Sequence, residues 1–419
     1  MSLAALADVT VEIGFGVNAV GGDFFVLDDP DQGELDNTTY LLAPDTVFVV
    51  VHDPANGVNT VRSIETNRGR NREIDEYGTG TATVVFNDND RTFDPAYNGS
   101  PYFGQIVPMK RIAIRCGNIN LFAGWVDDWR VTYEPGDNLS RVTASCVDAF
   151  AILANQKLSE IAPAHSGDLS GERITRVLDR GEINFPASRA IDDGNSTLGA
   201  TTFGENAAAY LQACSRAEAG YLFVTAGGTF TFHGRTAALN MPADVTFSDD
   251  PDAGIPYQSI AQRSSADLLY NLVTGVSETT GNPLVAFDQE AADGAFIRTL
   301  PLGTLFTIDD TQTQNLLDFH LERFKAPELR FQGVTVNVAA VDDVTSVLSL
   351  DLTDVVSVQR SPLSVGAMID RLSLVDGVSH HMTSGSWTMD LTFANVDTRS
   401  FLVLDDPVFG VLGTNRLAF

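Results

Sequence analysis

Apolar positions along the chain follow two periods, and the change between them is clearest from residue 170 to residue 234. Two stretches with the i, i+3, i+4 spacing of amphipathic helices come first, one from Ser170 to Gly181 and one ending at Gly220. Two β-rich runs then flank Gly227 and Gly228, which suit a tight turn because glycine tolerates positive φ. We predict a small helix-helix-hairpin domain and place it at residues 153–238. The residues that form these patterns are Ile174, Val177 and Leu178, then Ala207, Tyr210, Leu211 and Cys214, then Tyr221 to Val224 and Thr229 to Phe232.

Residues 46–152 show the strict alternation of half-buried strands. Apolar side chains recur at every second position in several short runs that are separated by acidic turns. A short helix is expected from Asp148 to Leu153, at the entry to the small domain. The alternating runs are Ala82, Val84 and Phe86; Ile112 and Ile114; Trp125 and Trp129; and Val142, Ala144 and Cys146.

Residues 239–397 repeat this pattern after one helix. The helix is predicted to begin at Asp310 or Thr311 and to stop at Pro327, since proline breaks a helix interior. Strands are then expected at 334–338, 347–352, 355–358, 372–374 and 387–393. The predicted fold is therefore mainly β with an α+β insert, in which two antiparallel β-barrel or sandwich modules flank the small domain. Because no structureless linker separates these parts, we expect them to pack together.

A short motif, F-x-V-L-D-D-P-x-x-G-x-L, occurs near each end of the sequence. It is too short to bury a core of its own, so we interpret both copies as docking segments that add to a sheet edge on a neighbouring subunit, within arms at 1–45 and 398–419. A plain β-turn favoured by Asp-Pro is the alternative. The predicted contact residues are Phe24, Leu27, Asp28, Asp29, Pro30 and Gly33, and then Phe401, Leu404, Asp405, Asp406, Pro407 and Gly410.

The net charge of the chain limits the classes of molecule that it is expected to bind. The 419 residues include 55 acidic and 26 basic side chains, for a net charge of -29. Such a surface repels nucleic acid, so no specific DNA or RNA binding is expected, although DNA could slide past it without adsorbing. Arg68, Arg70 and Arg72 have a spacing that could line one face of a strand, and we expect this stripe to bind an acidic face of a neighbouring subunit. We expect neither a signal peptide nor a membrane anchor.

The sequence offers no catalytic, cofactor or metal motif. HExxH, GxSxG and Walker patterns are lacking, and the three widely spaced cysteines read as small buried hydrophobes. The acidic run from Asp88 to Asp94 lacks the glycine and the distal Glu of a calcium loop. His380 and His381 would face opposite sides of a strand, which favours a turn or interface role over a metal site. We therefore expect no enzyme activity and no cofactor.

Several motifs, in order, resemble a known family. The runs at 68–75, 80–88 and 91–95, followed by Trp125, 129–132 and 146–151, resemble the first β-domain of minor tail proteins from long-tailed phages of actinobacteria. The central domain is similar to the second domain of baseplate or tail-tip hub proteins. The runs at 269–273, 377–381 and 387–393 resemble the closing β-domain of that family.

The resemblance implies a structural virion protein of the phage tail tip, made in the host cytoplasm. Hubs of this family are trimers whose two β-domains alternate around an axis, so that three chains adapt a hexameric tail tube to a three-fold tip. The implied partners are distal tail ring, tail tube, tape measure, and tip or fibre proteins, and the acidic charge would line a DNA channel. Two alternatives are a six-fold distal tail ring protein and a host-receptor or carbohydrate-binding module that uses Tyr97, Tyr102, Phe103 and Tyr257.

Overall fold

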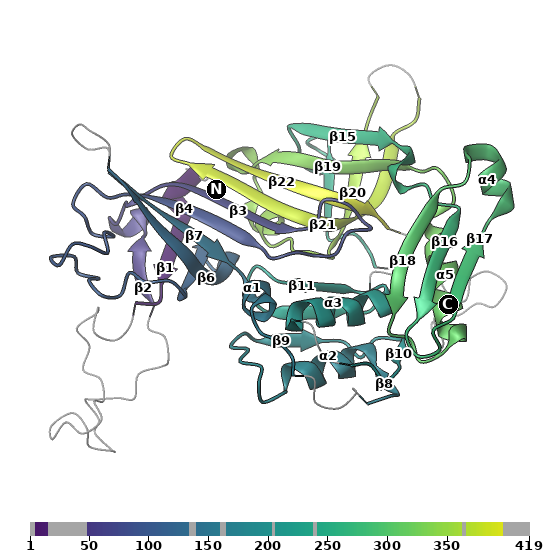
Figure 1. Ribbon diagram of the computed structural model, residues 1–419. Helices are drawn as coiled ribbons and strands as arrows, with labels where there is room; N and C mark the ends of the chain where they lie inside the picture. The colour runs from purple at the N-terminus through teal and green to yellow at the C-terminus, as the bar shows by residue number, and fades with distance from the viewer. Residues whose placement is uncertain are drawn as a thin grey trace.

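The structure is a computed structural model that describes residues 5–15, 48–133, 140–159, 165–202, 206–237, 241–362 and 366–396. Long strands of two β-modules cross the upper part of the view in Figure 1, with the central helices below them and a smaller sheet at the right. The fold is mainly β with a few helices, as the sequence predicted. None of the helices described here is long and apolar enough to span a membrane.

The first module is an antiparallel sheet in the order β3-β4-β7-β6-β5-β1-β2. Buried and exposed side chains alternate along β4 and β7, so one face of each strand lies in the core, as the period of two predicted. β1 lies inside the range expected for the N-terminal arm, yet it pairs with β5 of the same chain, from Val9 opposite Cys116 to Ile13 opposite Ile112. The strands are β1 (Val9–Ile13), β2 (Val49–His52), β3 (Val61–Gly69), β4 (Thr81–Asn87), β5 (Lys110–Cys116), β6 (Ile119–Thr132) and β7 (Arg141–Val147).

The second module is built around β21, which pairs with β20, β22 and β3. A parallel pair, β13 with β20, extends the sheet on one side, and β19 and β15 extend it beyond β22. The elements are β13 (Val245–Ser248), β14 (Ile255–Pro256), β15 (Ser259–Ser264), β19 (Leu329–Asn337), α6 (Val344–Leu348), β20 (Val355–Arg360), β21 (Ile369–Thr383) and β22 (Ser386–Asn395), with 3-10 turns at Ala5–Asp8, Pro54–Asn56, Ala266–Leu268 and Val338–Ala340.

One expected strand is wrong. Residues 347–352 do not form a strand, because α6 occupies Val344–Leu348. The Asp343 side chain caps this helix by accepting a hydrogen bond from the Ser346 N–H at 3.2 Å. A short buried apolar run fits a helix as well as a strand, so its period could not decide between them, and the cap did.

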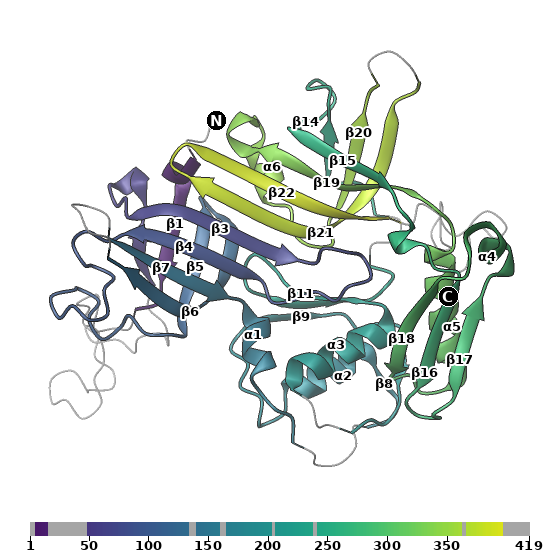
Figure 2. The same cartoon turned by 45° about the horizontal axis from the view of Figure 1, so that its top comes forward.

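The pairing of β3 with β21 joins the two modules into one sheet, as Figure 2 shows. The register runs from Gly69 opposite Gly377 to Ser63 opposite Thr383. Gly69 has a φ of +108°, and a Cβ there would lie 2.2 Å from the Asp376 carbonyl oxygen, so a larger residue would push the strands apart. A single hydrophobic core runs under both modules, which therefore pack together, as the lack of a linker predicted.

The central unit confirms the predicted order of two helices and a hairpin. Leu169 occupies the N-cap of α2, so Ser170 is the first helical residue and not the cap, and Ala219 ends α3 in the left-handed conformation, just before Gly220. The elements are α1 (Ala149–Ala154), β8 (Asp168–Leu169), α2 (Ser170–Leu178), β9 (Arg189–Ile191), β10 (Thr197–Leu198), α3 (Ala207–Glu218), β11 (Tyr221–Val224) and β12 (Phe230–His233).

A third sheet, which the sequence did not separate from the second module, lies at the other end of the molecule from β1 and β2 (Figure 1). Its order is β17-β16-β18, and α5 packs against one of its faces through a small apolar core. The predicted helix is confirmed with Asp309 as its N-cap. The elements are β16 (Leu272–Ser277), β17 (Pro283–Phe287), α4 (Gln289–Ala295), β18 (Thr299–Leu305) and α5 (Asp310–Phe324).

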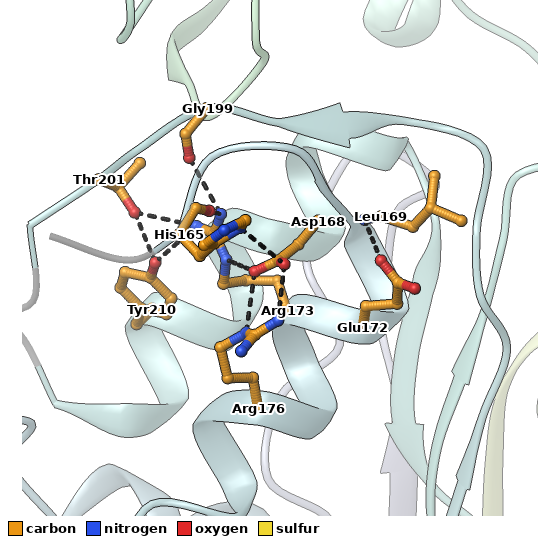
Figure 3. A network of polar contacts seen from close by, with 9 residues as sticks. All are labelled: His165, Asp168, Leu169, Glu172, Arg173, Arg176, Gly199, Thr201 and Tyr210. Carbon is orange, nitrogen blue, oxygen red and sulfur yellow. Dashed lines mark hydrogen bonds and ion pairs between the residues drawn. The ribbon is translucent and has the colours of Figure 1, made fainter.

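A buried arginine holds the central unit together. The Arg173 guanidinium is fully buried between α2 and α3, and each of its nitrogens donates a hydrogen bond (Figure 3). Nε pairs with the Asp168 carboxylate at 2.9 Å, and Nη1 donates to the Tyr210 hydroxyl at 3.1 Å. The other acceptors are the Thr201 hydroxyl and the carbonyls of His165 and Gly199. Because α2 carries the arginine and α3, β8 and two loops supply its partners, the charge fixes their relative position.

Replacing Arg173 should therefore destabilise the protein strongly. Arg173→Met leaves the buried Asp168 without its buried cationic partner and should cost about 3–5 kcal/mol in the free energy of unfolding, measured by urea denaturation. Arg176 also pairs with Asp168, but its side chain is 55% exposed, so Arg176→Met should cost less than about 1 kcal/mol. Equal effects of the two substitutions would contradict this assignment.

Asp148 links the first module to the central unit. It caps α1 by accepting a hydrogen bond from Phe150 N–H at 2.9 Å, and it accepts a second from Gly80 N–H at 2.6 Å, just before β4. Burial raises the pKa of Asp148 to about 7, although these two N–H groups and Arg68 oppose the rise. The short helix predicted from Asp148 is confirmed as α1.

The raised pKa of Asp148 predicts a pH dependence. The folded state keeps its proton up to about pH 7, whereas an unfolded Asp loses it near pH 4, so the folded protein loses stability as pH rises through this window. Measured against Asp148→Asn, the wild-type free energy of unfolding should fall by up to about 4 kcal/mol between pH 4 and pH 7 and then level off. A constant difference between the two proteins across that range would refute the prediction.

Candidate functional site

The two copies of the repeated motif lie outside the described residues. Their predicted docking roles, at positions from Phe24 to Gly33 and from Phe401 to Gly410, stay predictions. Two other regions of the described chain are candidate functional sites. One is the junction where the three parts of the chain meet, and the other is the surface of the third sheet.

The three arginines of the predicted stripe do not line one strand face, because β3 ends at Gly69 and leaves Arg70 and Arg72 in the following loop. Arg68 is buried and pairs with Asp351 of the second module at 2.6 Å. Arg72 is exposed and pairs with Asp75 at 3.1 Å. The guanidinium groups of Arg68 and Arg72 therefore already have partners within the chain, as does that of Arg70. Contact with a neighbouring subunit stays a prediction for all three.

Arg70 lies at the centre of a polar cluster at the junction. Its Nη2 pairs with the buried Asp376 carboxylate at 3.0 Å, and that same oxygen accepts a hydrogen bond from the Tyr77 hydroxyl at 2.8 Å. The guanidinium also stacks over the Tyr77 ring at 4.6 Å and lies 5.7 Å from the Tyr221 ring. The cluster thus connects the β3–β4 loop, β21 and the central hairpin.

A second ion pair extends this cluster toward the third sheet. Arg323, near the end of α5, pairs with the buried Glu73 carboxylate of the β3–β4 loop, and Arg330 lies 4.0 Å from the same group. Between the loop, α3, β18 and α5 lies a cavity of about 620 Å³. It is lined by Arg70, Glu73, Asp75, Glu76, Tyr77, Gln212, Arg216, Tyr221, Leu300, Pro301, His320, Arg323 and Phe324, among others.

The charges around the cavity are matched in pairs. Burial alone would lower the pKa of the Arg70 guanidinium, but Asp376 and Tyr77 outweigh it, so the pKa is raised and the group stays charged. Burial raises the pKa of Tyr77 and lowers that of His320, to about 3 for the histidine, so both side chains are neutral near pH 7. Arg216 pairs with Glu76 across the rim. Matched ion pairs and neutral rings are suited to joining structural units, not to activating a substrate.

The cysteines are buried, as the sequence predicted, whereas the histidine pair lies within β21 and not in a turn. Cys116, Cys146 and Cys214 are free and buried, and burial raises the pKa of each thiol. His380 is buried beside Trp387, whose Nε1 lies 3.3 Å from its Nδ1, whereas His381 lies on the opposite side of β21. Within the described ranges, no group of three or more His, Cys, Asp or Glu side chains is arranged to hold a metal ion.

The four aromatic residues considered as a carbohydrate platform are not gathered on one open loop surface. Tyr102 stacks on the buried Phe15 ring at 4.4 Å, and the Tyr257 hydroxyl donates to a backbone carbonyl at 3.2 Å. Tyr97 lies under the Arg91 guanidinium at 4.7 Å. Phe103 alone among the four is mostly exposed. Three of them therefore serve packing within the chain, which weakens support for a carbohydrate-binding role.

A surface that the sequence analysis missed lies on the third sheet. Val285 and Phe287 on β17 are 53% and 42% exposed, and Phe296 and Ile297, just before β18, are 89% and 64% exposed. The alternation of Val285 and Phe287 along residues 283–287 was the available signal. Gly281 and Asn282, directly before this run, favour a turn and weaken the strand signal.

The Arg70 cluster gives a testable prediction. Arg70→Met leaves the Asp376 charge buried without its cation and should lower the free energy of unfolding by about 3–5 kcal/mol in denaturant titrations. The double variant Arg70→Met/Asp376→Leu removes both charges and should recover most of this loss. Arg72→Met, at the exposed pair two residues away, is the control and should change stability by about 1 kcal/mol or less. A double variant no more stable than Arg70→Met would argue against the pairing.

No protein-family model matches the chain, and no curated protein matches it in sequence. Solved structures do match. The 43 kDa tail protein of prophage MuSo2 from Shewanella oneidensis superposes with a TM-score of 0.54 and 14% identity, over 83% of this chain and 95% of that chain. The tail protein from Neisseria meningitidis MC58 gives a TM-score of 0.54 and 12% identity, over 80% of this chain and 92% of that chain.

Both of these structures are described as tail proteins and not as enzymes. The coverage is high on both sides, so the likeness extends over both β-modules and the units between them. The identity is low, and what the likeness shows is the fold. The chain has the β-rich fold of phage tail proteins.

Proposed function

We propose that the chain is a structural protein of a phage tail tip, a trimeric hub without catalytic activity. In this hub the two β-modules of each subunit alternate around the axis, so that three chains present six similar positions to a hexameric tail tube and a three-fold surface to the tip. The protein would be made in the host cytoplasm and assembled into the virion, as a soluble protein. The proposed neighbours are the distal tail ring, the tail tube, the tape measure, and tip or fibre proteins.

The observation that carries the proposal is the fold shared with the prophage MuSo2 tail protein. The superposition covers more than four fifths of this chain and nearly all of that protein. The continuous sheet through β3 and β21 adds support, because it makes the two modules one rigid block. A ring subunit must keep a fixed angle between its two contact surfaces, and a shared sheet with a shared core supplies that stiffness. The ion pairs Arg70–Asp376 and Arg323–Glu73 at the junction also connect parts of this block.

The charge supports a channel role. A net charge of -29 spread over the chain disfavours adsorption of DNA phosphates, so an axial opening lined by such subunits would let a genome pass. The predicted subunit contacts include the N-terminal copy of the motif, from Phe24 to Gly33, and Arg72, whose side chain is exposed. A six-fold distal tail ring is the second candidate, because the same β-rich subunit could close a ring of six.

The oligomeric state of the purified protein tests the proposal. Light scattering should give a mass three times that of the 45.0 kDa chain. Leu27→Asp places a charge in the apolar part of the N-terminal motif and should shift the population toward monomer, whereas Asn37→Asp, with the same added charge outside the motif, should leave the trimer intact. A hexamer would favour the distal ring, and a protein that stays monomeric at high concentration would contradict a self-assembling hub.

A further inference from the structure

The third sheet has one covered face and one open face. Val273, Ala286 and Leu300 point to the covered face and pack against Leu316 and Leu317 of α5. Side chains alternate along a strand, so their neighbours Leu272, Val285 and Phe287 point the other way. The pairing places Leu272 opposite Phe287, and Thr274 opposite Val285. We call this open surface, with Phe296 and Ile297 at its end, the outer face.

A buried asparagine fixes the backbone at the Phe296 end of the outer face. Asn271 Nδ2 donates to the Phe296 carbonyl at 2.6 Å, and its Oδ1 accepts from the Arg298 N–H at 2.9 Å. Phe296 adopts a φ of +61°, which is rare for a residue with a side chain and costs conformational energy. In this unfavourable backbone conformation, the side chains of Phe296 and Ile297 are exposed. Rigid, exposed apolar side chains grouped on one surface mark a docking site.

The described chain leads to this surface. The Asn395 carbonyl at the end of β22 accepts a hydrogen bond from Arg323 Nη2 at 3.1 Å, in the last turn of α5. Two residues later, Lys325 pairs with Asp288 at 3.1 Å, and Asp288 directly follows Phe287. The side chains of Arg323 and Lys325 therefore place the end of β22 beside α5, on the covered side of the third sheet, near the end of β17 that carries Phe287. Phe401 follows Val396 by five residues, and five extended residues cover about 17 Å.

The sequence that follows has the matching chemistry. Phe401 to Leu404 are four consecutive apolar residues, and the Asp-Asp-Pro sequence that follows favours a turn. In an extended segment these four side chains alternate between two sides, so at least two of them face any surface against which the segment lies. The N-terminal copy of the motif is less well placed, because in the sequence it falls between β1 and β2, and these two strands lie at the opposite end of the molecule from β17 (Figure 1).

We propose that residues 401–412 dock on the outer face of the third sheet of their own chain, with the apolar run Phe401 to Leu404 covering Val285, Phe287 and Phe296. The sequence alone led us to expect both motif copies on a neighbouring subunit. The position of Asn395 assigns the C-terminal copy to its own chain and leaves the N-terminal copy for subunit contacts. This inference concerns the chain itself and does not rest on the proposed tail function.

A photo-crosslink from the outer face identifies the occupant. Phe287 is replaced by p-benzoylphenylalanine in the full-length protein, which is irradiated, separated on a denaturing gel and digested for mass spectrometry. The expected product migrates as a single chain and joins position 287 to a peptide from residues 398–415. The same amino acid at Phe103, an exposed aromatic in the first module, is the matched control and should not capture that peptide. A crosslink in a band of two chains, or to any other peptide, would overturn the proposal.

Removal of the segment provides a second, independent test. Deletion of residues 398–419 should expose the outer face and raise the fluorescence of the dye ANS at least about twofold, because the dye binds exposed apolar surface. Adding Val285→Ser/Phe287→Ser to the truncated protein should abolish this increase. Val107→Ser/Met109→Ser, two exposed apolar residues of the first module, should not. Unchanged dye fluorescence after the deletion, in a protein with an unchanged circular dichroism spectrum, would count against the docking.

Discussion

The pairing of β3 with β21 is the contact on which the rest of the molecule depends. These strands come from residues more than 300 positions apart, and their hydrogen bonds turn two β-modules into one sheet over one core. The close approach at Gly69 requires a residue without a side chain, because a Cβ would collide with the Asp376 carbonyl. Directly beyond this point the Arg70 side chain reaches the Asp376 carboxylate. The backbone and the ion pair therefore fix the same junction.

Buried charges recur wherever units of the chain meet. Arg68 reaches Asp351, whose other oxygen accepts from the Ala226 N–H of the central hairpin, and Arg323 reaches Glu73. Such pairs contribute little net stability, since burying two charges costs about as much as their attraction returns. Their effect is on geometry, because a misplaced unit would leave a buried charge unpaired. A subunit that must present two surfaces at a fixed angle benefits from this kind of specificity.

The cavity and the surface of the third sheet are better suited to contacts between polypeptides than to catalysis. The cavity at the junction is lined by ion pairs whose members already neutralise one another, and its histidine is held neutral by burial. The third sheet, in contrast, carries an apolar face that α5 does not cover, and Asn271 fixes the backbone at its Phe296 end. Together with the acidic charge, these features support the proposed role in assembly, because a net charge of -29 disfavours adsorption of nucleic acid.

The sequence by itself determined the local elements. Periodicity predicted α2, α3, α5, the central hairpin and strands such as β4, β7, β20 and β22, because each of these patterns is set by neighbours within a few residues. Only the tertiary structure decided what depends on distant residues. It turned the expected strand at 347–352 into α6, separated the third sheet from the second module, and gave Arg68 and Arg70 acidic partners about 280 and 300 residues away. Spacing along the chain carries no information about such partners, since they meet only when the sheet closes.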